Sequence, residues 1–330
     1  MTTIHSGQGR LATESHQAPK RSTKNIRSNG SRSPLAHLSS FTKECTMAQT
    51  VLDSRGWTVG GVRQGRWTLF NDTASASTEG VTTAAETINT LSGNDTIYGN
   101  LIAGSGSAGN PIAGVFIKSG TTLNMGFGDD RITGYGPLSN SYEYGIRNEG
   151  AVDTGYGNDI LEGTGNDGVF NSGVIRMGDG NDSLLGNGVS LDIVNRGSIY
   201  MGAGRDLITG LGPTSTIFNS GVIDTGDGND TVDALKGGFQ TDAPATATIL
   251  LGRGNDVLKG FGANQTFNGG AGIDGLVFLD GTYKVTAVGS GFDIVNNSSP
   301  AMHVTGFELI SGAATITAGR RVSCEASHTR

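Results

Sequence analysis

Apolar residues alternate with mixed ones along much of the chain, at fixed distances from two repeated polar markers. Two residues before each of four asparagines, and four residues after it, the side chain is Val or Ile. Two residues after each of six aspartates it is Ile, Leu or Val, whereas the positions between are mixed. This alternation has the period of a half-buried strand. No helical period runs through the region, so the pattern predicts an all-β chain of short strands.

The first marker is the motif G-x-G-x-D, which is followed by an aliphatic residue and recurs in seven copies between residues 126 and 276. Its aspartates are separated by 29, 23, 24, 24, 26 and 18 residues. A degenerate copy, SGNDTI, covers residues 92–97 and supplies Asp95. The second marker lies seven residues before the first glycine of the next motif, at Asn148, Asn171, Asn195 and Asn219. Two markers in one phase predict a repeated coil of about 24 residues.

Each coil reads as strand, N-x-G corner, strand, G-x-G-x-D loop, strand and glycine corner. One coil buries too little apolar surface alone, but stacking gives every strand a partner above and below. Equivalent inward positions then form aliphatic ladders and an asparagine ladder. We therefore expect a right-handed parallel β-helix or β-roll solenoid. From Gly252 to Gly270 the spacing is 18 residues, as in a two-motif β-roll coil, and Gln265 stands where the middle motif would have its aspartate.

Composition shifts along the chain suggest five parts. Residues 1–46 are basic, polar and poor in apolar pattern, so we expect a disordered tail, and Met47 is an alternative start. Residues 47–90 are expected to form an N-terminal segment or cap, and residues 91–275 the repeat solenoid. Residues 276–312 leave the repeat and should form a small β cap over the exposed strand edges. Residues 313–330 form a C-terminal tail.

Composition and charge narrow the function. The chain has 55 glycines among 330 residues, and its charge is +5 over residues 1–46 but −12 over residues 47–330. An acidic body argues against nucleic acid as a partner and suits a cation binder. Two cysteines and five scattered histidines form no zinc spacing. No stretch has the length of a membrane span, and no apolar signal-peptide core follows Met1 or Met47.

The repeated motif carries the chemistry of a calcium site. Calcium takes six to eight oxygens from carboxylates and carbonyls. The glycines let the backbone curl so that carbonyls converge, and the aspartate adds a carboxylate. A tight turn would accept Asn, Ser or Gly at this place, yet Asp stands in all seven copies. The predicted calcium-binding aspartates are Asp95, Asp130, Asp159, Asp182, Asp206, Asp230, Asp256 and Asp274. The predicted loop glycines are Gly126, Gly128, Gly155, Gly157, Gly178, Gly180, Gly202, Gly204, Gly226, Gly228, Gly252, Gly254, Gly270 and Gly272.

These motifs resemble the glycine-rich nonapeptide of the RTX, or hemolysin-type calcium-binding, repeat family. The stretch N-G-G-A-G-I-D-G-L-V-F at 268–278 is similar to a last full repeat, and T-G-F-E-L-I at 305–310 is similar to the segment that often follows. The resemblance covers about residues 91–310. It implies that aspartates and loop carbonyls bind Ca²⁺, and that the protein is secreted by a type I-like route and acts outside the cell or on its surface.

Two classes of function stay open at this stage. The first is a non-enzymatic extracellular protein ordered by calcium, with a structural or adhesive role and with polysaccharide or cell-surface partners. The second is a carbohydrate-active β-helix enzyme of the polysaccharide lyase or epimerase type. Outward residues that could line its groove are Arg147, Arg176, Arg196, Asp153, Asp224 and Tyr200. Tyr142, Glu143 and Tyr144 are the best candidates for a binding loop. No H-E-x-x-H or G-x-S-x-G motif occurs.

Overall fold

The structure is a computed structural model that describes residues 50–59, 62–76, 80–102, 112–138, 143–243, 247–297, 299–311 and 314–319. The predicted basic tail of residues 1–46 lies outside this range. Throughout the described residues the regular elements are strands, arranged in two sheets, so the expected all-β class is confirmed. The same residues include no helix that is long and apolar enough to cross a membrane.

Eighteen strands of the described chain belong to the larger sheet. They are β1 (Thr50–Asp53), β2 (Gly56–Val59), β3 (Val62–Gly65), β4 (Thr73–Ala76), β5 (Val81–Thr83), β7 (Thr96–Asn100), β8 (Ile112–Ile117), β10 (Arg131–Tyr135), β11 (Glu143–Asn148), β13 (Ile160–Asn171), β15 (Ser183–Asn195), β17 (Leu207–Gly210), β18 (Thr216–Asn219), β20 (Thr231–Asp233), β21 (Gly238–Gln240), β23 (Val257–Lys259), β25 (Gly275–Val277) and β29 (Leu309–Ser311).

Twelve described strands belong to the second sheet. They are β6 (Thr87–Asn89), β9 (Thr122–Asn124), β12 (Ala151–Asp153), β14 (Val174–Asp179), β16 (Ser198–Ala203), β19 (Val222–Asp227), β22 (Thr248–Leu250), β24 (Thr266–Asn268), β26 (Gly281–Val288), β27 (Gly291–Asn296), β28 (Met302–Thr305) and β30 (Ala314–Gly319).

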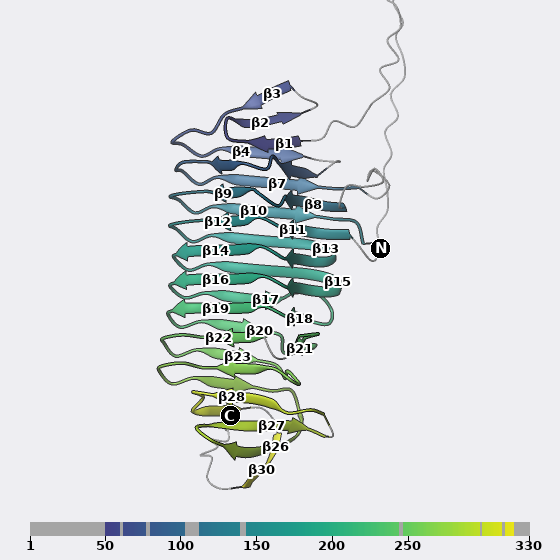
Figure 1. The fold of residues 1–330 in the computed structure, drawn as a ribbon, viewed down its shortest axis with the longest axis vertical. Helices are drawn as coiled ribbons and strands as arrows, with labels where there is room; N and C mark the ends of the chain where they lie inside the picture. Colours follow the sequence, from purple (N-terminus) through teal and green to yellow (C-terminus); the bar gives the residue numbers. More distant parts are fainter. Residues whose placement is uncertain are drawn as a thin grey trace, which may run out of the picture. The chain divides into compact units, whose positions relative to one another are not determined.

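Successive repeats stack in parallel and in register (Figure 1). In the larger sheet Leu161 pairs with Leu184, and Leu184 pairs with Ile208. In the second sheet Ile175 pairs with Ile199 in the same way. All five side chains are fully buried, which confirms the predicted aliphatic ladders. The core therefore lies between the two sheets, and each repeat adds one layer to it.

The predicted asparagine ladder is also present. The side-chain amide of Asn148 donates to the side-chain oxygen of Asn171, and the same 2.8 Å bond joins Asn171 to Asn195 and Asn195 to Asn219. All four side chains are fully buried. Each buried amide therefore finds its partner on the next coil, which fixes the register of the stack.

Parallel stacking begins before residue 91. Strand β4 pairs in parallel with β7, β5 with β8, and β6 with β9. Antiparallel pairing of β1 with β2 and of β2 with β3 forms a cap on these first coils. The N-terminal segment thus contributes strands to the parallel stack as well as this antiparallel part.

At the other end, β26, β27 and β28 form an antiparallel meander. Strands β28 and β29 then return to the parallel stack, on β24 and β25 respectively. Strand β30, within the expected tail, pairs with β26.

The second glycine of each loop is required by close contact as well as by φ. Gly204 has φ +146°, and a Cβ placed on it would lie 1.6 Å from the carbonyl oxygen of Gly180 on the preceding coil. Gly289 also has positive φ, +61°, but a Cβ there would meet nothing within 4 Å. A substitution at Gly289 therefore tests backbone strain alone, whereas one at Gly204 tests strain together with a steric clash.

We predict that Gly289→Ala lowers the free energy of unfolding by about 1 kcal/mol, the usual cost of a left-handed conformation. Gly204→Ala should lower it by more than about 3 kcal/mol, because strain and the displacement of a stacked coil add. Denaturant unfolding in millimolar calcium measures both values. Equal costs for the two variants would contradict the close packing of the loops.

Candidate metal centre

The eight predicted aspartates lie in one column along the edge where the G-x-G-x-D loops stack. Each follows a loop and immediately precedes a strand of the larger sheet, such as β10, β13 or β15. Their exposed fractions are between 0% and 2%. The structure therefore brings together every aspartate that the repeat predicts, and it buries all of them.

One oxygen of each carboxylate is used within the column. The backbone N–H of Asp95 donates to Oδ1 of Asp130 at 2.6 Å, and the N–H of Asp130 donates to Oδ1 of Asp159 at 2.7 Å. The pattern continues through the remaining coils to the bond from Asp256 N–H to Oδ1 of Asp274, at 2.9 Å. Each aspartate thus accepts a hydrogen bond from the coil before it, and we call this series the aspartate ladder.

The aspartate ladder has two terminal members that sequence reasoning missed. The N–H of Asp72 donates to Oδ1 of Asp95 at 2.8 Å, and the N–H of Asp274 donates to Oε2 of Glu308 at 2.8 Å. The Asn-Asp pair at 71–72 repeats the Asn-Asp pair of the degenerate copy, which is the signal that could have located Asp72. Glu308 precedes the aliphatic strand β29 as the aspartates precede theirs.

The second oxygen of each carboxylate makes no hydrogen bond within 3.5 Å, although the hydroxyls of Thr90, Thr154 and Thr225 lie near enough to oppose the effect of burial on the pKa of Asp95, Asp159 and Asp230. Oδ2 is buried and makes no hydrogen bond in the described structure in Asp95, Asp130, Asp159, Asp182, Asp206, Asp230, Asp256 and Asp274. A Cβ placed on Gly269 would lie 2.8 Å from Oδ2 of Asp274, so the position five residues before the aspartate faces this oxygen. In other coils this position holds buried side chains such as Thr154 and Met177. A buried, unpaired carboxylate oxygen is costly, so the column needs a cation or a proton.

Burial shifts the titration of the whole column. Desolvation raises the pKa of Asp130 to about 8, against the opposing effect of the N–H bond from Asp95. It raises the pKa of Asp182, Asp206 and Asp256 to about 7. Burial also raises the pKa of Asp95, Asp159, Asp230 and Asp274. Without a counter-charge, the folded column holds protons more tightly than free aspartates do.

The predicted loop glycines all have positive φ, between +91° and +154°. Second glycines also touch along the stack: a Cβ on Gly157 would lie 1.9 Å from the carbonyl oxygen of Gly128, and one on Gly228 would lie 1.4 Å from that of Gly204. These carbonyl oxygens therefore form a column of their own. In the degenerate copy Leu91 stands at the first-glycine place with φ +86°, a conformation that is unusual for leucine.

An outer ladder runs through the asparagine or aspartate that stands before most of these aspartates. The backbone N–H of Asn181 donates to the side-chain oxygen of Asn158 at 3.0 Å, and the N–H of Arg205 donates to that of Asn181 at 2.9 Å. Asn94 and Asp129 accept in the same way. These exposed side chains tie neighbouring loops together, which explains the frequent Asn-Asp pairs of the motif.

Four of the residues considered for an enzyme groove, Asp153, Arg176, Tyr200 and Asp224, pair in register across neighbouring strands of the second sheet, whereas Arg147 lies on the larger sheet. Arg147 lies in β11 of the larger sheet, donates to Glu149 at 2.8 Å and lies over the rings of Phe116, Tyr144 and Phe170. Arg176 lies in β14 of the other sheet, 5.6 Å from the ring centre of Tyr200. Each arginine thus has a structural neighbour, and the two sheets separate them.

The residues expected to form a binding loop are partly in a buried strand. Glu143 and Tyr144 begin β11 and are only 2% and 6% exposed, which corrects the expectation that they present a binding surface. Tyr144 is buried because its ring packs against Phe170 on the neighbouring strand and Arg147 lies over it. Tyr142 lies outside the described residues.

Within the described ranges, no group of three or more His, Cys, Asp or Glu side chains has the arrangement of a metal site. Comparison with known proteins adds no family: no family model matches the chain, and no curated protein matches it.

Proposed function

We propose that this chain is a secreted or cell-surface calcium-binding repeat protein, in which Ca²⁺ neutralises the aspartate ladder and holds the coils together in a structural or adhesive role. The observation that carries the proposal is the set of eight buried Oδ2 atoms that make no hydrogen bond. The proposed location of the protein outside the cell or on its surface rests on the resemblance of the repeats to the RTX family.

The types of donor in the column suit such an ion. Calcium prefers carboxylate and carbonyl oxygens, and the loop edge offers both in every coil. The aspartates of neighbouring loops would supply Oδ2, and the loop glycines would supply backbone carbonyls. When bound, the ion supplies positive charge in a place that water does not reach. The chain's own contribution is to hold each carboxylate in position by the N–H of the neighbouring aspartate.

The stack described above supports the finer fold as part of this proposal. A strand of one sheet, a corner, a strand of the other sheet and a glycine loop together make one turn of a right-handed β-helix of about 24 residues, narrowing to a β-roll coil near Gly252–Gly270. In such a solenoid the loop edge runs as one continuous line, which is what a column of ions needs.

The test is a calcium titration of the wild type and of Asp206→Asn by calorimetry. Asparagine keeps the oxygen that accepts from Asp182 N–H but removes the charge and the free Oδ2. Asp206→Asn should bind fewer calcium ions than the wild type. Without calcium at about pH 8 it should instead be more stable than the wild type by a few kcal/mol, because it lacks one buried carboxylate.

The matched control is Asp179→Asn, which removes the same charge from an exposed position on the neighbouring loop, residues 178–182. Its calcium stoichiometry and stability should equal those of the wild type. If the wild type shows no saturable heat with calcium, or if Asp206→Asn binds as many ions as the wild type, the calcium proposal is wrong.

A further inference from the structure

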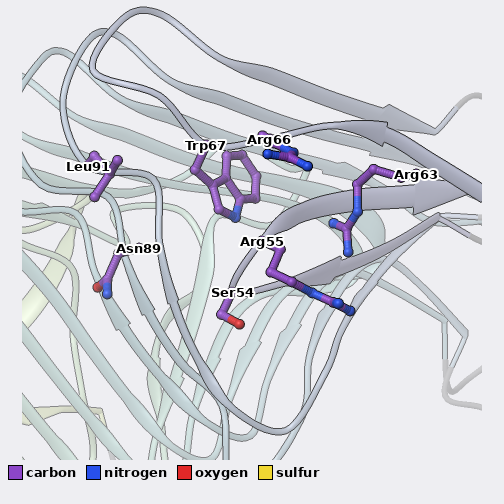
Figure 2. A pocket seen from close by; sticks show the side chains of 7 residues that line it. All are labelled: Ser54, Arg55, Arg63, Arg66, Trp67, Asn89 and Leu91. Carbon is purple, nitrogen blue, oxygen red and sulfur yellow. The ribbon is translucent and has the colours of Figure 1, made fainter.

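A pocket of about 600 Å³ lies where the N-terminal cap meets the first coils. Figure 2 shows that the cap contributes Ser54, Arg55, Arg66 and Trp67, and that Asn89 and Leu91 lie across from them. Its volume is within the range of ~300–1,000 Å³ that is typical of small-ligand sites. It is separate from the aspartate ladder, which runs through the buried side of the loops.

The pocket is positive in an otherwise acidic body. Residues 50–67 contain three arginines and one acidic residue, Asp53, whereas residues 47–330 together carry −12. Arg63 is occupied, because it makes two bonds of 2.8 and 2.7 Å to the carboxylate of Asp53. This pair lowers the pKa of Asp53 and keeps it charged.

Arg55 and Arg66 are the arginines available to a ligand. Arg55 has a side chain that is 79% exposed and lies 3.5 Å from Asp53 at its nearest. Arg66 is exposed, and among the described residues none forms an ion pair with it. The nearby acid Glu86 accepts a bond from the backbone N–H of Ser54. The pocket therefore presents Arg66, which has no ion pair among the described residues, and Arg55, whose exposed guanidinium shares Asp53 with Arg63.

A rigid ring forms one wall of the pocket. The indole N–H of Trp67 donates to the backbone oxygen of Asp53 at 2.9 Å, and its ring lies 5.2 Å from that of Trp57. The orientation of the ring is thus fixed before any ligand arrives. Ser54 and Asn89 add groups that can both donate and accept hydrogen bonds.

We propose that this pocket binds an acidic sugar residue of an extracellular polysaccharide. Guanidinium groups pair with a carboxylate through two parallel hydrogen bonds, hydroxyls suit Ser54 and Asn89, and the small exposed part of Trp67 offers an apolar contact. A nucleic-acid strand fits less well, because every nucleotide adds a negative charge that would meet the acidic body. The inference rests on the proposed extracellular role and names its partner, but it does not use the calcium sites.

Tryptophan fluorescence of the calcium-loaded full chain tests this directly. The chain has two tryptophans, Trp57 and Trp67, and both belong to this region. We expect trigalacturonate to change the emission in a saturable way. Arg55→Gln with Arg66→Gln should weaken its binding at least about tenfold, since each lost charged bond removes much of the affinity. Arg205→Gln, an exposed arginine on a distant loop, is the matched control and should bind as the wild type does.

Each other outcome counts against the proposal. No change in emission, or equal binding by the double variant, would remove the pocket as a site. Equal affinity for neutral maltotriose would exclude the acidic group, and equal affinity for inorganic sulfate would exclude the sugar. Tighter binding of trithymidylate would assign the pocket to nucleic acid. Far-UV circular dichroism of the same samples shows whether the coils are folded, so failure of the calcium proposal is seen separately.

Discussion

Removing calcium at about pH 9 is expected to abolish the strand structure of the protein, because eight buried carboxylates then lose their counter-charge. Stacked coils lie ~4.8 Å apart, so each neighbouring pair of ionised aspartates repels by about 3.5 kcal/mol at an effective dielectric constant of ~20. Seven neighbouring pairs then cost roughly 25 kcal/mol, above the ~5–15 kcal/mol by which a typical domain is stable. The N–H bonds of the aspartate ladder offset only part of this repulsion.

Far-UV circular dichroism during a calcium titration of chelator-treated protein measures the effect. Strand signal should be low without calcium and should return cooperatively at millimolar calcium. Magnesium is the control ion: it demands short, octahedral coordination and gives up its waters reluctantly, so it should restore little structure. A strand signal that stays the same in chelator and in calcium would falsify the coupling of folding to the metal.

Acid should rescue the calcium-free protein. Burial raises the pKa of Asp130 to about 8 and that of Asp206 to about 7, whereas an aspartate in an unfolded chain has a pKa near ~3.9. Between these values the folded chain binds more protons than the unfolded chain. Its stability therefore falls as the pH rises, by about 1.4 kcal/mol per pH unit for each such group, and the contribution is fully present only below about pH 4.

Calcium should reverse the sign of this dependence. Protons compete with the ion for the same carboxylates, so in millimolar calcium the protein should become less stable as the pH falls from about 8 to 5. Denaturant midpoints across this range, with and without calcium, would show two curves of opposite slope. Parallel curves would mean that the aspartates do not bind the ion, and a calcium-free curve that does not fall as the pH rises would mean that their pKa values are not raised.

Much of the stack could be predicted, because aligning the copies of a repeat shows which residues are paired on neighbouring coils. The aspartates recur in phase with Asn148, Asn171, Asn195 and Asn219, so one alignment predicted which residues meet on neighbouring coils. The aliphatic and asparagine ladders follow from this alignment, and both are present. The inward direction of the apolar residues follows from the period of a strand.

The ends of the aspartate ladder, the roles of its two carboxylate oxygens and the pocket depend on single contacts that do not recur in the repeat. Asp72 joins the aspartate ladder from a loop that has Phe70 where other loops have their second glycine, so the motif is not recognisable there. Glu308 replaces the usual aspartate. The sequence does not show that Oδ1 accepts a hydrogen bond while Oδ2 does not, because this depends on the direction of the neighbouring N–H. The pocket of Trp67 and Leu91 combines a hairpin with a coil, and residue spacing says nothing about how these pack.

The bonds of the aspartate ladder all point the same way: every N–H donates to the coil that follows it in the chain. Each coil thus has one donating face and one accepting face, and any coil can be added to any other in the same orientation. Only the first and last coils need different chemistry, which Asp72 and Glu308 provide. Duplication or loss of a middle coil therefore leaves every bond with a partner, so a chain built this way can change its length over evolution without redesign of its ends.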